Sequence, residues 1–97
     1  LPNVPKKASN LKRHIEECQY DMMENIFAYN LQRTNRVKEK HLYDYIVKLS
    51  MYDYYARELY HKKYISSHQL ECLSNIIIEA RKIAYGIIRS SESKEQN

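Results

Sequence analysis

Two histidine–cysteine pairs are the residues of this sequence whose types and spacing come closest to a chemical site. His14 and Cys18 are four residues apart, and His68 and Cys72 repeat that interval. Residues four apart share one face of a helix, and imidazole and thiolate are both ligands of zinc. The alternative is that each histidine is a polar surface residue and each cysteine a buried free thiol in a reducing compartment. We favour this alternative and predict no metal site and no cofactor.

Asp53 is the strongest single candidate for a catalytic group, because it falls near Leu49 and Ala56 on an apolar stripe. A catalytic carboxylate needs a second titratable partner and a pocket, and the sequence indicates neither. A contact with Arg57 or with a tyrosine hydroxyl would satisfy the charge instead. The only glycine is Gly86, so no glycine-rich phosphate loop is present. We therefore predict that the protein is not an enzyme.

Basic residues gather at the two ends of the predicted helical bundle, in a chain with a net charge of +4. One end gathers Arg33, Arg36, Lys38, Lys40, His41, Arg81, Lys82 and Arg89. The other end gathers Lys6, Lys7, Lys12, Arg13, His61, Lys62 and Lys63. Such ends suit phosphate groups, with an affinity that falls as salt rises. Basic side chains are also favoured at helix C-termini, so solvated helix ends are an equally good interpretation.

Tyrosine dominates the aromatic residues, with ten tyrosines beside one phenylalanine and no tryptophan. Six of them surround the second predicted helix, and one helix cannot turn six rings toward a single core. Exposed tyrosines serve protein interfaces or stack on single-stranded bases. Because tyrosine is enriched at protein interfaces, we predict an interface made by Tyr43, Tyr52, Tyr54 and Tyr55.

Three long helices have to position these residues. An apolar stripe at intervals of three and four predicts the first helix over about 8–33. This stripe comprises Leu11, Ile15, Cys18, Met22, Ile26 and Tyr29. The same spacing predicts a second helix over about 36–62 and a third over about 67–90, which is the most apolar and should be the most buried. Ser66 and Gln69 fit a capping box at the start of the third helix.

Short connections between these helices predict an all-α fold, an antiparallel up-down helical bundle. We expect residues 1–91 to form a single domain and residues 92–97 a flexible tail. Four helices close a bundle more commonly than three, so we expect a fourth helix to precede Leu1 or to come from a partner subunit. The sequence shows no apolar run of about 20 residues and no signal peptide. We therefore expect a cytoplasmic protein.

A set of residues spread over roughly positions 1–91 resembles a known family. It includes Leu1-Pro2 to Lys6, then Ile15, Ile26, Ala28, Leu49, Tyr52, Tyr55, Ala56 and Arg57. It continues with Tyr64-Ile65-Ser66, Gln69, Glu79, Lys82-Ile83 and Gly86 to Ile88-Arg89. The pattern resembles the four-helix-bundle family of accessory variability determinant (Avd-like) proteins of diversity-generating retroelements, with the related bundles encoded in ribosomal RNA intervening sequences. Two features differ: the family often has Gly-Gly-Trp-Ile at the segment Tyr85–Ile88, and its first helix would precede Leu1.

The resemblance implies a non-enzymatic, nucleic-acid-binding accessory protein of a mobile element. It would bind RNA rather than DNA, act with a reverse transcriptase, and assemble as a homo-oligomeric ring with a pentamer as precedent. On this view the nucleic-acid contacts are Arg36, Lys38, Lys40, Arg57, Arg81, Lys82 and Arg89. The alternative function is a protein-binding adaptor or regulator whose tyrosine-rich helix face holds a partner. Salt dependence separates the two, because polyanion binding weakens steeply with salt and an apolar interface does not.

Overall fold

The computed structural model describes the backbone of residues 9–96 and the side chains of residues 9–93. Over this range the chain forms three helices, α1 (Ser9–Leu31), α2 (Asn35–His61) and α3 (Ser67–Gln96). Residues 9–96 contain no strand, which confirms the predicted all-helical class. The first residues of the predicted domain, with the basic Lys6 and Lys7, lie outside the described residues.

The first two helices end within about two residues of their predicted bounds, but α3 is longer than predicted. It continues to Gln96 instead of ending near Ser90, and so enters the segment expected to be a flexible tail. No glycine or proline follows Ser90. The glutamate, lysine and glutamine residues in this segment are good helix formers, so the helix meets no local stop signal.

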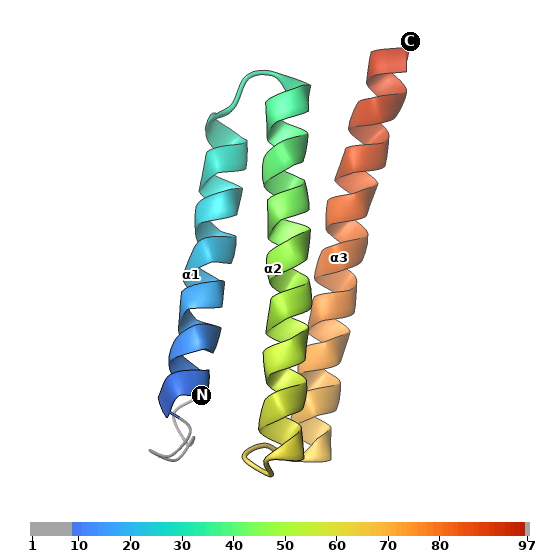
Figure 1. Cartoon of the computed structure of the whole chain (residues 1–97). Coiled ribbons are helices and arrows are strands. Elements are labelled where there is room, and N and C mark those ends of the chain that lie inside the picture. Colours follow the sequence, from blue (N-terminus) through green and yellow to red (C-terminus); the bar gives the residue numbers. More distant parts are fainter. Residues whose placement is uncertain (1–8, 97) are drawn as a thin grey trace.

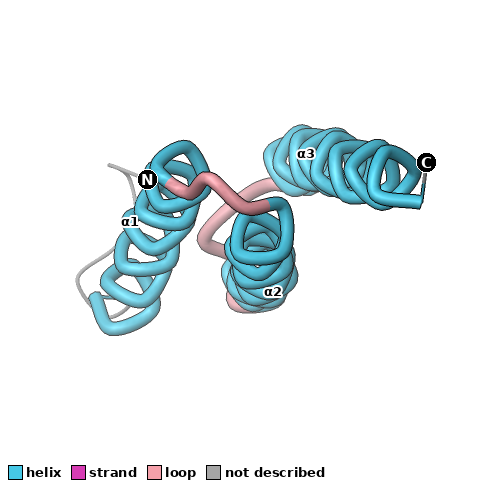
Figure 2. The backbone as a smooth tube through the Cα atoms, turned by 90° about the horizontal axis from the view of Figure 1, so that it is seen from above, coloured by secondary structure: helices cyan, strands magenta, loops and turns pink. Residues whose placement is uncertain are grey.

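The central helix α2 lies between the two outer helices, α1 and α3. Figure 1 shows the chain running up α1, down α2 and up α3, so that consecutive helices are antiparallel. α2 packs against both neighbours, whereas no Cα atom of α1 lies within 8 Å of α3 along the described helices. Seen from above, α1 and α3 diverge from α2 like the arms of a V (Figure 2). None of the described helices is long and apolar enough to cross a membrane.

The core follows the central helix. From α2 it takes Leu42, Ile46, Leu49, Ala56 and Leu59. The outer helices add Ile15 and Cys18 from α1, and Ile77, Ala84 and Ile88 from α3. The prediction that the third helix is the most buried is therefore wrong, and α2 is the most buried. The reason is that α3 has a single neighbour, so only one of its faces is covered.

Backbone and side-chain hydrogen bonds fix the turn between α2 and α3. Lys63 adopts the left-handed conformation with φ 64°, and the Tyr64 N–H donates to the Leu59 carbonyl at 2.8 Å, as in a Schellman helix end. The Ser66 N–H donates to Gln69 Oε1 at 2.8 Å, and the Gln69 N–H donates to Ser66 Oγ at 3.1 Å. These two reciprocal bonds confirm the predicted capping box.

Polar contacts set the register of α1 against α2. The Cys18 thiol donates to the Lys48 carbonyl at 3.1 Å, and Lys48 Nζ lies 3.1 Å from Asp21 Oδ2. The predicted apolar stripe of α1 is wrong at one position. Ile26 was expected to be buried but is exposed, and the adjacent Asn25 is half-buried. The face of α1 that packs against α2 therefore contains a polar side chain, and Ile26 lies outside this contact.

Candidate functional site

α3 carries two apolar seams, and only one of them is covered. The covered seam faces α2 and comprises Leu70, Ile77, Ala84 and Ile88. The second seam repeats at intervals of four and three and comprises Leu73, Ile76, Ala80, Ile83 and Ile87. On this second seam Ile76 is 65 % exposed and Ile83 is 62 % exposed. Because isoleucine is normally among the most buried residue types, the open seam is a candidate binding surface of the described chain.

The open seam forms one wall of a groove. Its opposite wall is α1 and its floor is α2, with a hollow of about 380 Å³ between them. The α1 wall includes Met22, Met23 and Ile26, the floor Tyr45, Leu49 and Tyr52, and the α3 wall Leu73, Ile76, Ile77 and Ala80. The lining is predominantly apolar, so it suits the apolar side chains of a partner rather than a charged ligand.

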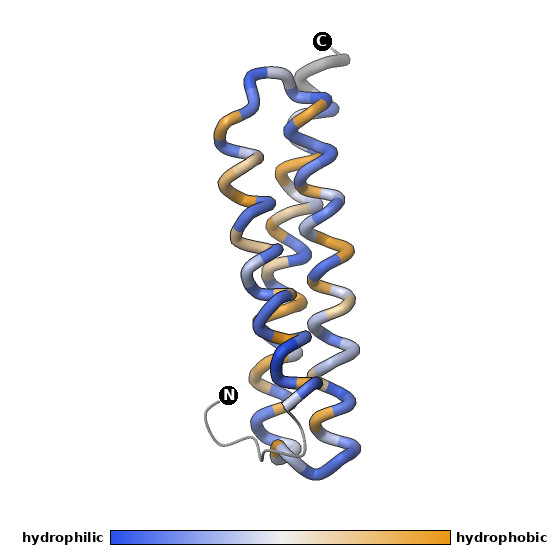
Figure 3. Tube along the Cα trace, turned by 60° about the vertical axis from the view of Figure 1, so that its left-hand side comes forward, coloured by the Kyte–Doolittle hydropathy of each residue, from blue (hydrophilic) through white to orange (hydrophobic). Residues whose placement is uncertain are grey.

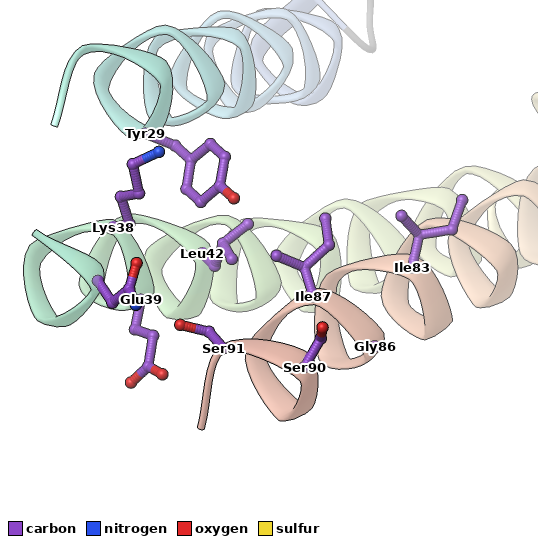
Figure 4. Close-up of a pocket in the computed structure, with 10 residues that line it drawn as sticks. Tyr29, Lys38, Glu39, Leu42, Ile83, Gly86, Ile87, Ser90 and Ser91 are labelled. Carbon is purple, nitrogen blue, oxygen red and sulfur yellow. The ribbon is translucent and has the colours of Figure 1, made fainter. Parts of the chain in front are cut away.

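The groove continues toward the C-terminal end of α3. A second hollow of about 390 Å³ there lies between Tyr29 of α1, Leu42 of α2 and Ile87 of α3, and its lining is more polar than that of the first because it also includes Lys38, Glu39, Ser90 and Ser91. Figure 4 shows Ile83 and Ile87 projecting from α3 toward the space beside Tyr29. Lys38 closes this end, because its Nζ atom lies 5.0 Å from the centroid of the Tyr29 ring, a cation–π distance. The two hollows together are called the α1–α3 groove below.

A second apolar surface lies on the other side of α2. Its residues are Tyr43, Val47, Met51 and Tyr54, all of them exposed. A helix turns by about 100° per residue, which places these residues roughly half a turn away from Tyr45, Leu49 and Tyr52 on the groove floor. Hydrophobic positions accordingly recur on more than one side of the molecule (Figure 3). These four residues are called the α2 ridge below.

The structure divides the four tyrosines of the predicted interface into two pairs. Tyr43 and Tyr54 lie on the α2 ridge and are exposed. Tyr52 and Tyr55 instead serve the contact between α1 and α2. The Tyr52 hydroxyl accepts a hydrogen bond from Gln19 at 3.1 Å, and the Tyr55 ring stacks on a histidine of α1 with a centroid distance of 5.9 Å. Tyr43 and Tyr54 are thus open to a partner on the far side of α2, whereas Tyr52 contributes to the groove floor and Tyr55 is covered in part by α1.

The two histidine–cysteine pairs lie on helices that do not touch. Cys18 is buried, but Cys72 is exposed, so the predicted burial of Cys72 is wrong. The cause is its position on a side of α3 that α2 does not cover. Cys72 Sγ lies 3.7 Å from His68 Nε2, whereas His14 stacks on Tyr55. The described residues contain no group of three or more His, Cys, Asp and Glu that could hold a metal ion.

Three groups have pKa values above their ordinary range. Burial raises the pKa of the Cys18 thiol and of the Tyr45 hydroxyl. The hydrogen bond to Asp21 raises the pKa of Lys48. A thiol with a raised pKa stays protonated at neutral pH and is a weak nucleophile. The candidate carboxylate Asp53 pairs with Arg57 at 3.2 Å, which confirms the expected contact.

The residues predicted to contact nucleic acid are spread along the whole length of the molecule. Arg36, Lys38 and Lys40 lie in the first two turns of α2, and Arg57 lies near its far end. Lys40 pairs with Asp44 at 3.9 Å. Of these four residues, only Arg36 makes no ion pair or ring contact within the described part of the chain.

The three predicted residues on α3 do not join this end as a group. Arg81 and Lys82 lie about midway along the helix, and only Arg89 lies closer to its C-terminal end. Arg81 Nη2 donates to Ser50 Oγ at 3.3 Å, and Lys82 Nζ lies 3.6 Å from Glu79 Oε1. The structure thus assembles no single basic face from the seven residues.

The residues missed by the sequence analysis are those of the groove walls, such as Met23, Ile76 and Ile83. A signal for them was present in α3, where two apolar stripes run side by side. One stripe contains Ile77 and Ala84, and the other Ile76 and Ile83. Because the two stripes are adjacent, apolar spacing alone does not distinguish one buried and one open face from a single broad buried face.

Comparison with known proteins adds no relative. No protein-family profile, no curated protein and no solved structure matches the chain.

Proposed function

We propose that this chain is a non-enzymatic protein-binding module whose α1–α3 groove receives the apolar face of a helix. The observation that carries this proposal is the open seam of α3, with Ile76 and Ile83 exposed opposite Met23 of α1. Two isoleucines and a methionine therefore lie on a surface that no other described part of the chain covers. Fully burying one such side chain contributes about 1.5–3 kcal/mol, so a partner that covers several gains a stable contact.

The length and the helical walls of the groove suit a helix. The open seam runs from Leu73 to Ile87, which is about 21 Å at a rise of about 1.5 Å per residue. Its floor and walls are helices, and a helix laid among them completes the local arrangement of a four-helix bundle. Recognition by apolar side chains at intervals of three and four is a common mode of protein binding.

A peptide-binding measurement tests this function. The probe is a fluorescent amphipathic helix of about 18 residues with leucine at its heptad core positions. We expect the wild-type chain to bind it, and the double variant Ile76→Glu/Ile83→Glu to bind at least about tenfold more weakly, because a buried carboxylate has no partner in the groove. Fluorescence anisotropy gives both affinities. Binding should change little between low and high salt.

The matched control is Ile78→Glu, which places the same charge on an exposed residue of α3 outside the groove lining. This variant should bind the peptide like the wild type. Equal binding by all three proteins would show that the groove is not the contact surface. Failure of the wild type to bind any such peptide would contradict the proposed function itself.

A second candidate function, nucleic-acid binding, is favoured by one observation. Arg33 lies in the α1–α2 turn and Arg36 in the first turn of α2, both are exposed, and no ion pair with an acidic side chain is seen for either within the described residues. Free guanidinium groups bind phosphates well.

Charge reversal of Arg36, Lys38 and Lys40 together should then abolish RNA binding while leaving the helical content intact. Reversal of Lys12, Arg13 and Lys62 at the opposite end is the control, and unchanged RNA binding in the first variant would contradict this candidate. The role beside a reverse transcriptase in a mobile element stays a prediction from resemblance.

A further inference from the structure

His68 and Cys72 bring an imidazole and a thiol together on an exposed part of α3. Cys72 Sγ lies 3.7 Å from His68 Nε2, and both residues are exposed. Imidazole nitrogen and thiolate sulfur are both zinc ligands, and two ligands four residues apart on one helix form a common chelating arrangement. The pair therefore presents two metal-ligating atoms to solvent on one side of the helix.

The separation of the two atoms matches one edge of a tetrahedral zinc site. Zinc binds a histidine nitrogen at about 2.0–2.1 Å and a cysteine sulfur at about 2.3 Å. Two such bonds at the tetrahedral angle place the nitrogen and the sulfur about 3.6 Å apart. The observed distance between His68 Nε2 and Cys72 Sγ, 3.7 Å, is close to this value. One ion can therefore bind both atoms with little movement of either side chain.

The start of α3 holds the backbone that carries the pair. Ser66 and Gln69 exchange two hydrogen bonds, at 2.8 Å and 3.1 Å, across the first turn. The Leu70 N–H also donates to the Ser66 carbonyl at 3.0 Å. His68 lies within this turn, and Cys72 follows one turn later on the neighbouring surface. A pair that is held in place before binding loses less conformational freedom when a ligand arrives.

The charge beside the pair favours a cation. Glu71 is exposed and follows His68 by three residues, which places the two side chains on neighbouring parts of the helix surface. No ion pair with a basic side chain is seen for Glu71 among residues 9–93. Its negative charge is thus available to stabilise a positive ion bound next to it.

The pair on α1 has the same spacing but a different environment. Cys18 is buried, and its thiol donates to the Lys48 carbonyl at 3.1 Å. The ring of His14 stacks on Tyr55 at a centroid distance of 5.9 Å. A metal ion would have to break both contacts to reach this pair. The fold therefore uses one histidine–cysteine pair for packing and leaves the other open.

From these observations we propose that His68 and Cys72 form a two-ligand zinc site on α3. The remaining coordination positions are open to water or to a ligand from another molecule. On binding, Cys72 releases its thiol proton to solvent and binds as the thiolate, and His68 binds through its unprotonated Nε2 atom. The site goes beyond the proposed function, because neither residue lines the α1–α3 groove.

A cobalt titration tests the proposal, because Co²⁺ replaces Zn²⁺ in tetrahedral sites and a cobalt–thiolate bond absorbs in the near ultraviolet. The probe is Co²⁺ alone, added to the reduced, metal-free chain. We expect a charge-transfer band that saturates at one ion per chain and disappears when Zn²⁺ is added. Cys72→Ser should abolish the band. His68→Ala should weaken Co²⁺ binding at least about tenfold, because it removes one of the two ligands.

The second pair supplies matched controls. His14→Ala and Cys18→Ser should both bind Co²⁺ like the wild type, and circular dichroism checks that every variant keeps its helical content. A wild type without the band at millimolar Co²⁺ would overturn the inference, as would a band that survives in Cys72→Ser. Equal affinity of His68→Ala and the wild type would also overturn it, because the thiol would then bind the ion without the imidazole.

Discussion

At the scale of single residues, Asn25 is the least satisfied side chain between α1 and α2. Its Nδ2 atom is buried, and no hydrogen-bond partner reaches it in the described part of the chain. An unpaired buried donor costs about 1–3 kcal/mol. The residue stands where the seam of α1, which runs through Cys18 and Met22, continues toward Tyr29.

We predict that Asn25→Leu stabilises the fold by about 1–2 kcal/mol, because it removes the unpaired amide and adds apolar contact. Urea unfolding monitored by circular dichroism measures the change. Asn30→Leu, at an exposed position of the same helix, is the control and should lie within about 0.5 kcal/mol of the wild type. A destabilised Asn25→Leu variant would mean that the amide has a role in the seam.

Proton binding by three residues leads to a prediction for alkaline pH. Cys18, Tyr45 and Lys48 all have raised pKa values in the fold, so the folded state holds their protons more tightly than the unfolded state does. The free energy of unfolding should therefore fall as the pH rises above 9.0, the ordinary pKa of Cys18. The lysine contribution is fully present below its ordinary pKa of 10.5 and is lost as the pH rises through the higher folded value.

Thermal unfolding between pH 7 and pH 11 measures this decline. In Cys18→Ala the first part of the decline, near pH 9, should disappear while the later part remains. A free energy of unfolding that stays constant or rises with pH over this range would contradict the assignment of the three groups.

At the scale of elements, the two seams of α3 differ in what they do for the isolated chain. Ile77 is buried against α2, and its neighbour Ile76 is 65 % exposed in the groove. We predict that Ile77→Ala destabilises the monomer by about 2–4 kcal/mol through lost burial and a cavity. Ile76→Ala should cost less than about 0.5 kcal/mol. Urea unfolding at micromolar concentration compares them, and equal costs would show that the groove is closed in solution.

The elements were predictable from the sequence because their signals are local. Intervals of three and four gave the three helices, and Ser66 with Gln69 gave the capping box that the structure confirms. The end of α3 was not predictable from apolar spacing, because residues after Ser90 form helix without contributing to a core.

The candidate site was less predictable, because exposure depends on which helices become neighbours. Tyr52 and Tyr43 are the same residue type on one helix, yet only the second remains exposed. The spacing of apolar residues does not indicate that α1 and α3 lie apart, and this separation forms the groove. For the same reason Cys72, expected to be buried, is exposed.

At the scale of the whole molecule, the chain is extended for its length. Its radius of gyration is 15.6 Å, against about 12.5 Å for a compact domain of this size. Three helices in a V leave the inner faces of the arms without a neighbour (Figure 2). A partner helix between the arms would complete a bundle.

The most direct test is methyl NMR spectroscopy of the Val47→Glu variant, titrated with the amphipathic peptide. This variant keeps the groove and changes only the α2 ridge on the opposite side of the helix. We expect shift changes at the methyl groups of Met23, Ile76 and Ile83, with those of Met51 on the ridge and Ile78 on the outer face unchanged. Changes at Met51 or Ile78 alone, or none at any methyl group at saturating peptide, would contradict this expectation.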